Sequence, residues 1–216
     1  MPKYSLITQG ALLRVAQVFN WATKEHYILW FTGARHRSRR IEILLKRLTD
    51  QGKLVSVGYG KKLIYIAPRY RQSSYSYQVE HGLGVTEGLV RFIISDRSGV
   101  IIPERKFQGF GVRPEFGIAY KEGILLYEFC TRDNARRMNV LRIKLINYAK
   151  FVDKHTVVFV MDLPRDDVRS IVRKLRPQGP YLFTDHDTFL SVPLGQQLII
   201  PIYIWEDGNE YPLRSS

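Results

Sequence analysis

The sequence predicts two domains of mixed α and β structure: a small helical domain that ends in a β-hairpin, and a larger α/β domain with a mixed sheet. Positive charge is concentrated in the first, because residues 1–71 hold 14 Lys and Arg against 3 Asp and Glu, whereas residues 72–216 hold 19 against 17. Strand-like and helix-like segments alternate only after residue 78, which is the pattern of an α/β domain. The polar stretch RYRQSSYSYQ between them has no apolar periodicity. We therefore expect a first domain over 1–71, a linker over 72–78 and a second domain over 79–216.

Three helices and a hairpin are expected in the first domain. Residues 6–22 form a helix that Thr8 can cap, and residues 23–31 form a second helix that stops at Gly33. The third helix follows Ser38 and buries one apolar stripe at the spacing i, i+3, i+4, i+7, made of Ile41, Leu44, Leu45 and Leu48. Strands at 54–57 and 63–66 flank a turn over 58–62. This order of elements predicts a winged helix-turn-helix.

The third helix and the hairpin are the predicted contact surface for double-stranded DNA. A helix of this shape fits the major groove, and clustered cations release counterions from the phosphate backbone. The residues expected to contact DNA are Arg35, Arg37, Arg39, Arg40, Lys46, Arg47, Lys61 and Lys62. The alternative is that these charges only solvate a helix face. The concentration of charge in one third of the chain favours DNA binding.

The second domain is expected to alternate helices and strands. Helices are predicted at 79–94, 135–151 and 165–175, and strands near 99–102, 116–120, 124–129, 156–161 and 181–190, with a last apolar run at 198–205. The triplet Asp185-His186-Asp187 is interpreted as a polar part of a strand rather than a metal site, because successive strand residues point to opposite faces.

Composition excludes several classes of protein. The single cysteine, Cys130, excludes an internal disulfide and a zinc site with several thiolates. The start of the chain lacks the apolar core of a signal peptide, and no apolar run reaches the ~20 residues that span a bilayer. We expect a cytoplasmic protein with no membrane partner.

Acidic residues of the second domain resemble the active site of the restriction-endonuclease-like superfamily. The resemblance rests on Glu87 in a helix, Pro114-Glu115 before a strand, and Glu128 on the next strand. In that superfamily the two strand carboxylates hold Mg²⁺, and a lysine two residues after the second one orients the attacking water. This chain has Cys130 at that position, and a thiol cannot supply a permanent positive charge. The resemblance therefore implies a degenerate site, unless Lys144 reaches back from the following helix.

A second resemblance covers nearly the whole chain. The segments HGLGVTEGLVRF, PERKF, RPEF, ILLYEFCTRDN and LRIKLINYAKF are similar to the replication-relaxation family of plasmids and mobile elements. That family joins a winged helix to a nuclease-like domain. The matching positions are His81, Glu104, Arg105, Arg113, Pro114, Glu115, Glu128, Lys144 and Tyr148, although family members commonly have Asp in place of Glu115. The resemblance implies DNA transactions on a mobile replicon.

Three functions follow from these features. The leading hypothesis is a non-enzymatic DNA-binding protein acting in replication, its control or transcription, with no cofactor required. The alternative is a Mg²⁺-dependent nuclease or nickase in which Glu115, Glu128 and Lys144 are catalytic and Glu115, Glu128 and Glu87 bind the metal. The non-catalytic interpretation of the same residues is that Glu115 lies in a solvent-facing turn and Glu128 on a solvent-facing part of a strand. The third is a structural adaptor whose second domain binds another protein or forms a homodimer while the winged helix binds DNA.

Overall fold

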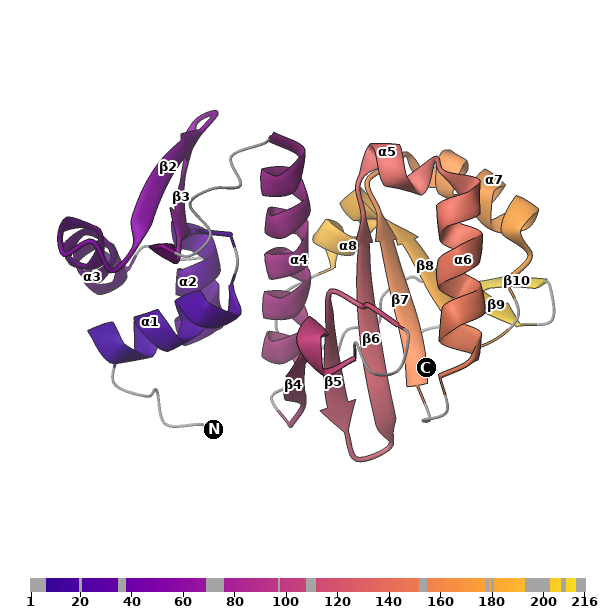
Figure 1. Ribbon diagram of the computed structural model, residues 1–216, viewed down its shortest axis with the longest axis horizontal. Coiled ribbons are helices and arrows are strands. Elements are labelled where there is room, and N and C mark those ends of the chain that lie inside the picture. The colour runs from indigo at the N-terminus through magenta and orange to yellow at the C-terminus, as the bar shows by residue number, and fades with distance from the viewer. Residues whose placement is uncertain are drawn as a thin grey trace. The chain divides into compact units, whose positions relative to one another are not determined.

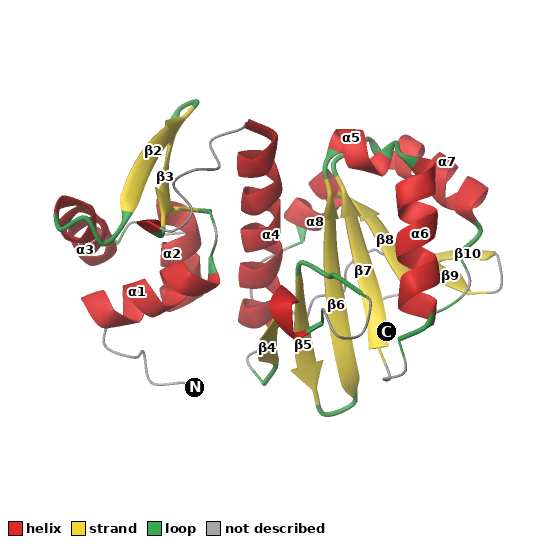
Figure 2. Ribbon diagram, viewed as in Figure 1, coloured by secondary structure: helices red, strands yellow, loops and turns green. Residues whose placement is uncertain are grey.

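The computed structural model describes residues 7–19, 21–34, 38–68, 76–96, 98–107, 112–151, 155–177, 179, 181–192, 203–206 and 209–212. Arg35 and Arg37 therefore lie outside the described residues, as does the part of the expected linker before Ser76. The chain divides into two compact units, Met1–Ser95 and Asp96–Ser216, and both combine helices with a sheet (Figures 1 and 2).

The described residues of the first unit form four α-helices and a small antiparallel sheet. The elements of this unit are α1 (Gln9–Val18), β1 (Ala22–Thr23), α2 (Lys24–Thr32), α3 (Arg39–Asp50), β2 (Val55–Tyr59), β3 (Lys62–Ile66) and α4 (Ser76–Ser95). The strand order is β1-β3-β2. The Thr8 hydroxyl caps α1 by accepting a hydrogen bond from the Ala11 amide at 3.1 Å, and Gly33 ends α2 in the left-handed conformation at φ 72°. The three predicted helices thus form, but the first ends at Val18 rather than at residue 22, because Ala22 and Thr23 form strand β1.

The β2–β3 hairpin has a shorter turn than the sequence pattern suggested. Pairing runs from Val55 with Ile66 to Tyr59 with Lys62, so only two residues form the turn. A two-residue turn needs a positive φ that matches the strand twist, and Gly60 supplies it at φ 55°. The five-residue loop expected over 58–62 is therefore wrong, because backbone pairing continues into it.

Helix α4 belongs to the first unit, although it was expected to begin the second domain. Val79 shares an apolar cluster with Trp21, Ile64 and Ile66. Gly82 lies against Trp21 so closely that an added Cβ would stand 2.0 Å from the indole ring. The division of the chain therefore falls after Ser95 rather than at residues 72–78, since α4 shares its core with the preceding elements.

In the part of the second unit that the structure describes, seven strands form one mixed sheet. The elements of this unit are β4 (Val100–Pro103), η2 (Glu104–Lys106), β5 (Phe116–Tyr120), β6 (Gly123–Cys130), α5 (Arg132–Ala135), α6 (Met138–Ala149), β7 (His155–Met161), α7 (Arg165–Leu175), β8 (Tyr181–Asp185), α8 (His186–Ser191), β9 (Tyr203–Glu206) and β10 (Asn209–Pro212). The order is β10-β9-β8-β7-β6-β5-β4. The β6–β7 and β7–β8 pairs are parallel and the others antiparallel. The expected mixed sheet is confirmed.

Helices α6 and α7 cover one face of this sheet (Figure 1). Leu145 of α6 and Val172 of α7 pack in the same core as Leu126 and Phe159 of the strands. The strand predicted over 181–190 ends at Asp185, because the Asp185 carboxylate accepts the Thr188 amide at 2.7 Å and starts α8. The interpretation of Asp185-His186-Asp187 as strand was therefore wrong beyond its first residue. Within the described residues, no helix is both long and apolar enough to cross a membrane.

Candidate nucleic-acid interface and candidate catalytic site

The outer face of α3 is basic and exposed. Arg39, Arg40, Lys46 and Arg47 are all exposed there, while Ile41, Leu45 and Leu48 are fully buried on the inner face. Lys61 and Lys62 are exposed at the tip of the neighbouring hairpin. We call these six cations the α3–hairpin surface.

Acidic residues of α3 do little to neutralise this surface. Glu42 is paired with Lys24 of α2 at 3.1 Å, and Asp50 lies at the last position of the helix. One of the six cations also has a structural contact, because Arg40 Nε donates to the Ile7 carbonyl at 2.9 Å. The sequence pattern gave no sign of that contact, since 33 positions separate the two residues.

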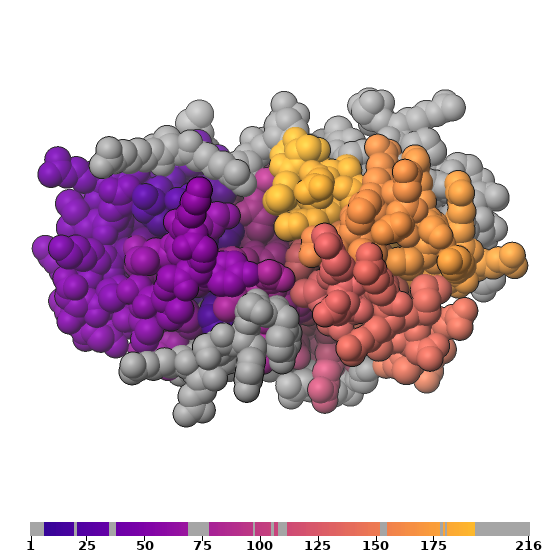
Figure 3. Space-filling model, turned by 90° about the horizontal axis from the view of Figure 1, so that it is seen from above, coloured from indigo at the N-terminus to yellow at the C-terminus, as the bar shows by residue number. Residues whose placement is uncertain are grey.

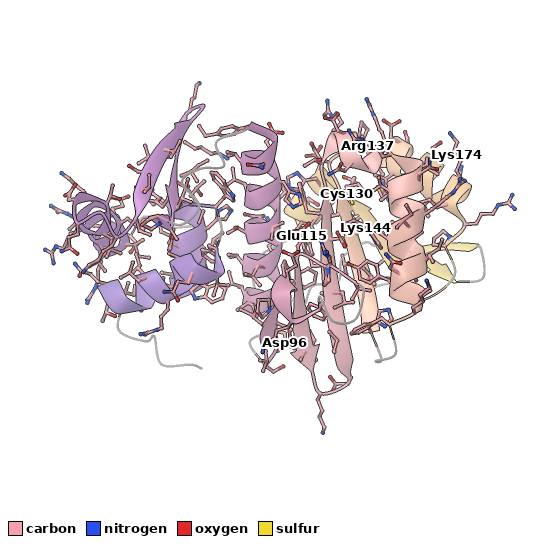
Figure 4. All side chains as sticks on the ribbon, viewed as in Figure 1. Asp96, Glu115, Cys130, Arg137, Lys144 and Lys174 are labelled. Carbon is pink, nitrogen blue, oxygen red and sulfur yellow. The ribbon has the colours of Figure 1, made fainter. Side chains whose placement is uncertain are left out.

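The second unit holds a buried carboxylate at Glu128 of β6, which is 1% exposed. Lys144 and Tyr148 are one turn apart on α6 and so lie on the same side of that helix. The Lys144 ammonium donates to Glu128 Oε2 and the Tyr148 hydroxyl donates to Oε1. Figure 4 shows Glu115, Cys130 and Lys144 close together in the middle of this unit. The interpretation of Glu128 as a solvent-facing strand residue is therefore wrong.

Glu115 lies directly before β5 and opposite Glu128. The last cross-strand pair joins Phe116 to Tyr127, and the Glu115 amide donates to the Tyr127 carbonyl at 2.9 Å, so the next residues of the two strands face one another. Directly opposed residues of an antiparallel pair project to the same face. The half-buried Glu115 carboxylate accordingly interacts electrostatically with Glu128. The structure thus brings together Glu115, Glu128 and Lys144.

The charges of this cluster follow from burial and from each other. Burial raises the pKa of Glu128, the Lys144 ammonium opposes this, and the negative charge of Glu115 adds to it. Burial would lower the pKa of Lys144, but Glu128 and the other acidic neighbours outweigh it and the net direction is upward. Burial raises the pKa of Cys130 to about 12, so its thiol is neutral at physiological pH. The positive charge beside Glu128 therefore comes from Lys144, because the Cys130 thiol carries none.

Glu115 and Glu128 are two carboxylates of the type that Mg²⁺ prefers as ligands. A cation would offset the repulsion between them. Each oxygen of Glu128 accepts one hydrogen bond from α6 and keeps a second lone pair. Among the residues that the structure describes, no group of three or more His, Cys, Asp or Glu side chains is arranged to hold a metal ion.

Glu87, the third predicted metal ligand, has a structural role in the first unit. Its Oε2 lies 3.0 Å from His26 Nε2 and its Oε1 accepts from Arg91 Nε at 2.6 Å. The Thr23 amide donates to His26 Nδ1, so His26 Nε2 carries the proton that points at Glu87. Burial alone would raise the pKa of Glu87, but His26 and Arg91 lower it to about 2. Both oxygens are therefore engaged within the protein.

The other positions of the family resemblance occupy varied environments. His81 lies half-buried on α4, Glu104 and Arg105 lie in η2, and Arg113 is exposed beside the buried Pro114. Glu87 and Arg91 are four residues apart on one helix, and this i, i+4 spacing indicates an ion pair from the sequence alone. The partner His26 had no local signal, because it lies 61 positions away.

A second concentration of positive charge lies in residues 131–177 and was not among the predicted features. Residues 131–177 hold 12 Lys and Arg against 5 Asp and Glu, whereas residues 178–216 hold 1 against 5, so the average over the C-terminal part hid it. Side chains of α6 and α7 are at the surface of the second unit in Figure 3 (salmon and orange). Arg142 of α6 and Lys174 of α7 are exposed, as is Arg137 directly before α6.

Comparison of the chain with known proteins finds no matching family model and no matching curated protein.

Proposed function

We propose that this protein binds duplex DNA through the first unit, which we interpret as a winged helix-turn-helix with α3 as the recognition helix. The observation that carries the proposal is the exposure of Arg39, Lys46 and Arg47 on the face of α3 opposite its core. A helix inserted in the major groove needs a polar, cationic outer face, and the hairpin cations are suited to the adjacent phosphates. DNA binding of this kind requires no cofactor. The resemblance to the replication-relaxation family suggests a role in replication, its control or transcription on a mobile replicon.

The test is a salt titration of duplex binding by the full-length protein. We expect Lys46→Ala/Arg47→Ala to weaken binding, and Lys61→Ala/Lys62→Ala to reduce the slope of log affinity against log salt by about 2, roughly one unit per lost phosphate contact. Arg40 is left intact because it also bonds the Ile7 carbonyl. The matched control is Lys106→Ala/Lys121→Ala, which removes two exposed cations of the second unit. Equal affinities for this control and the two test variants would refute the proposal.

A Mg²⁺-dependent nuclease or nickase is the second candidate, and one contact favours it. Lys144 approaches Glu128 from α6 and so supplies the cation missing at Cys130. Glu115 and Glu128 would hold the metal, which polarises the scissile phosphate and lowers the pKa of a bound water. Lys144 stays protonated beside the carboxylates, and Tyr148 fixes the orientation of Glu128 through its hydroxyl.

Incubation with supercoiled plasmid and Mg²⁺ or Mn²⁺ tests this candidate. Nicking by this site should be lost in Glu115→Gln, Glu128→Gln and Lys144→Met. The control variants Glu122→Gln and Lys150→Met change exposed residues and should retain it. If the wild type does not nick, or if nicking persists in all three site variants, the nuclease candidate is refuted while DNA binding stands.

A further inference from the structure

An isoleucine stands in the middle of the basic face of α3. Ile43 is 49% exposed, although Ile41, Leu45 and Leu48 of the same helix are fully buried. It lies four residues after Arg39 and three before Lys46, so all three side chains are neighbours on the outer face of the helix.

The surroundings of Ile43 restrict what can cover it. The exposed side chains of α3 closest to it along the outer face are cations, and Glu42, the acidic residue beside it in sequence, is held by Lys24. An apolar protein surface would have to desolvate these cations without pairing them, which is costly. The major groove of DNA can satisfy both kinds of side chain: phosphates along its edges pair with the cations, and the C5-methyl group of thymine on its floor is an apolar partner for Ile43.

We propose that Ile43 contacts a thymine methyl group and thereby makes the protein prefer a T·A pair at one position of its site. This inference rests on the proposed DNA binding and deepens it by naming a specificity-determining residue. Arg39 lies one turn toward the start of α3, the part of a recognition helix that reaches base edges, and Asp50 limits the basic face at its other end.

The experiment uses the full-length protein and a duplex selected from random sequences. Each thymine of the selected site is replaced in turn by deoxyuridine, which removes only the methyl group. At one position we expect affinity to fall about fourfold, the effect of one buried methyl-sized group. Ile43→Ala should bind the thymine duplex about as weakly as the wild type binds the deoxyuridine duplex, and should no longer distinguish the two.

Two further variants separate base contact from a general effect. Ile43→Val keeps a branched apolar side chain and should retain part of the discrimination. Ile146→Ala removes an isoleucine of the second unit that is 55% exposed, and should leave discrimination unchanged.

The outcomes for the two proposals differ. Salt-sensitive duplex binding that is equal for thymine and deoxyuridine at every position, or discrimination that survives in Ile43→Ala, overturns the role of Ile43 and leaves DNA binding intact. If the selection enriches no thymine-containing sequence, the role of Ile43 is likewise overturned and DNA binding stands. Absence of salt-sensitive duplex binding in the wild type overturns both.

Discussion

At the scale of single residues, Glu128 and Glu87 are both buried carboxylates, and each has a different set of partners. Glu128 accepts from Lys144 and Tyr148, and burial raises its pKa. Glu87 is paired with His26 and Arg91, which lower its pKa to about 2. A buried charge is tolerated only when it is paired and hydrogen-bonded. Removing one partner should therefore cost more than removing both members of a pair.

The Glu128–Lys144 pair provides the first prediction. Lys144→Met leaves a buried carboxylate without its cation, and we expect a loss of about 3–5 kcal/mol in the free energy of unfolding at pH 7. Glu128→Gln/Lys144→Met should recover most of that loss. Since removing Lys144 raises the pKa of Glu128 further, the single variant should become more stable as the pH falls and Glu128 takes up a proton. Urea unfolding across pH measures this, with Lys150→Met as the exposed control. Equal losses in the single and double variants would contradict it.

The second prediction concerns Glu87. Its folded-state pKa is lowered, so its contribution to stability is complete above the unfolded value of 4.5 and is lost as the pH falls toward about 2. Glu87→Gln should cost on the order of 3 kcal/mol at pH 7, and the gap to the wild type should close through that acidic range. Denaturant unfolding at several pH values measures the gap. The control is Asp50→Asn, which changes an exposed carboxylate of the same unit; a gap independent of pH would argue against the ion pair.

At the scale of elements, α4 is held to the first unit by contacts from several sides. The Thr86 hydroxyl donates to the Trp21 carbonyl at 2.7 Å, and Tyr59 of the hairpin donates to Glu80 at 2.7 Å. Close approach at Trp21 depends on Gly82 having no side chain. Glycine in a helix interior is otherwise unfavourable, so its presence here indicates a packing requirement.

Gly82→Ala is the third prediction. Alanine favours a helix over glycine, yet a methyl group here would overlap Trp21, and we expect a net loss of about 1–3 kcal/mol. Thermal and urea unfolding followed by tryptophan fluorescence would detect it. Gly10→Ala in α1 is the matched control, because its added Cβ has no neighbour nearer than 3.8 Å and should not destabilise the protein. A neutral or stabilising Gly82→Ala would show that α4 does not pack against Trp21.

At the scale of the whole molecule, the division after Ser95 changes which fragment is a folding unit. A fragment of residues 1–71 retains the predicted winged helix but loses Val79 from the cluster around Trp21 and leaves His26 without Glu87. A fragment of residues 1–95 keeps both.

The fourth prediction compares these two fragments. Residues 1–95 should unfold cooperatively in urea, and residues 1–71 should be less stable or not cooperatively folded, because Trp21 and Ile64 lose their cover. Circular dichroism with tryptophan fluorescence measures both. If the shorter fragment is as stable as the longer one, the core of the first unit does not need α4.

The sequence by itself determined the elements whose signals are local. Helices α2, α3 and α7 begin and end near the predicted residues, because apolar spacing and, for α2, a terminal glycine act within a few positions. The sequence also predicted that Glu115 and Glu128 lie close together, because a tight turn between two antiparallel strands fixes which residues face one another.

Only the tertiary structure decided which unit contains α4, what holds Glu87, and whether Lys144 reaches Glu128. These contacts join residues 61 and 16 positions apart, and their geometry depends on how whole elements pack rather than on the residues between them. The same holds for Arg40, whose bond to Ile7 no charge pattern indicates. Composition and periodicity indicate which side of a helix or strand is buried. Which other element packs against that side depends on contacts between residues far apart in the sequence.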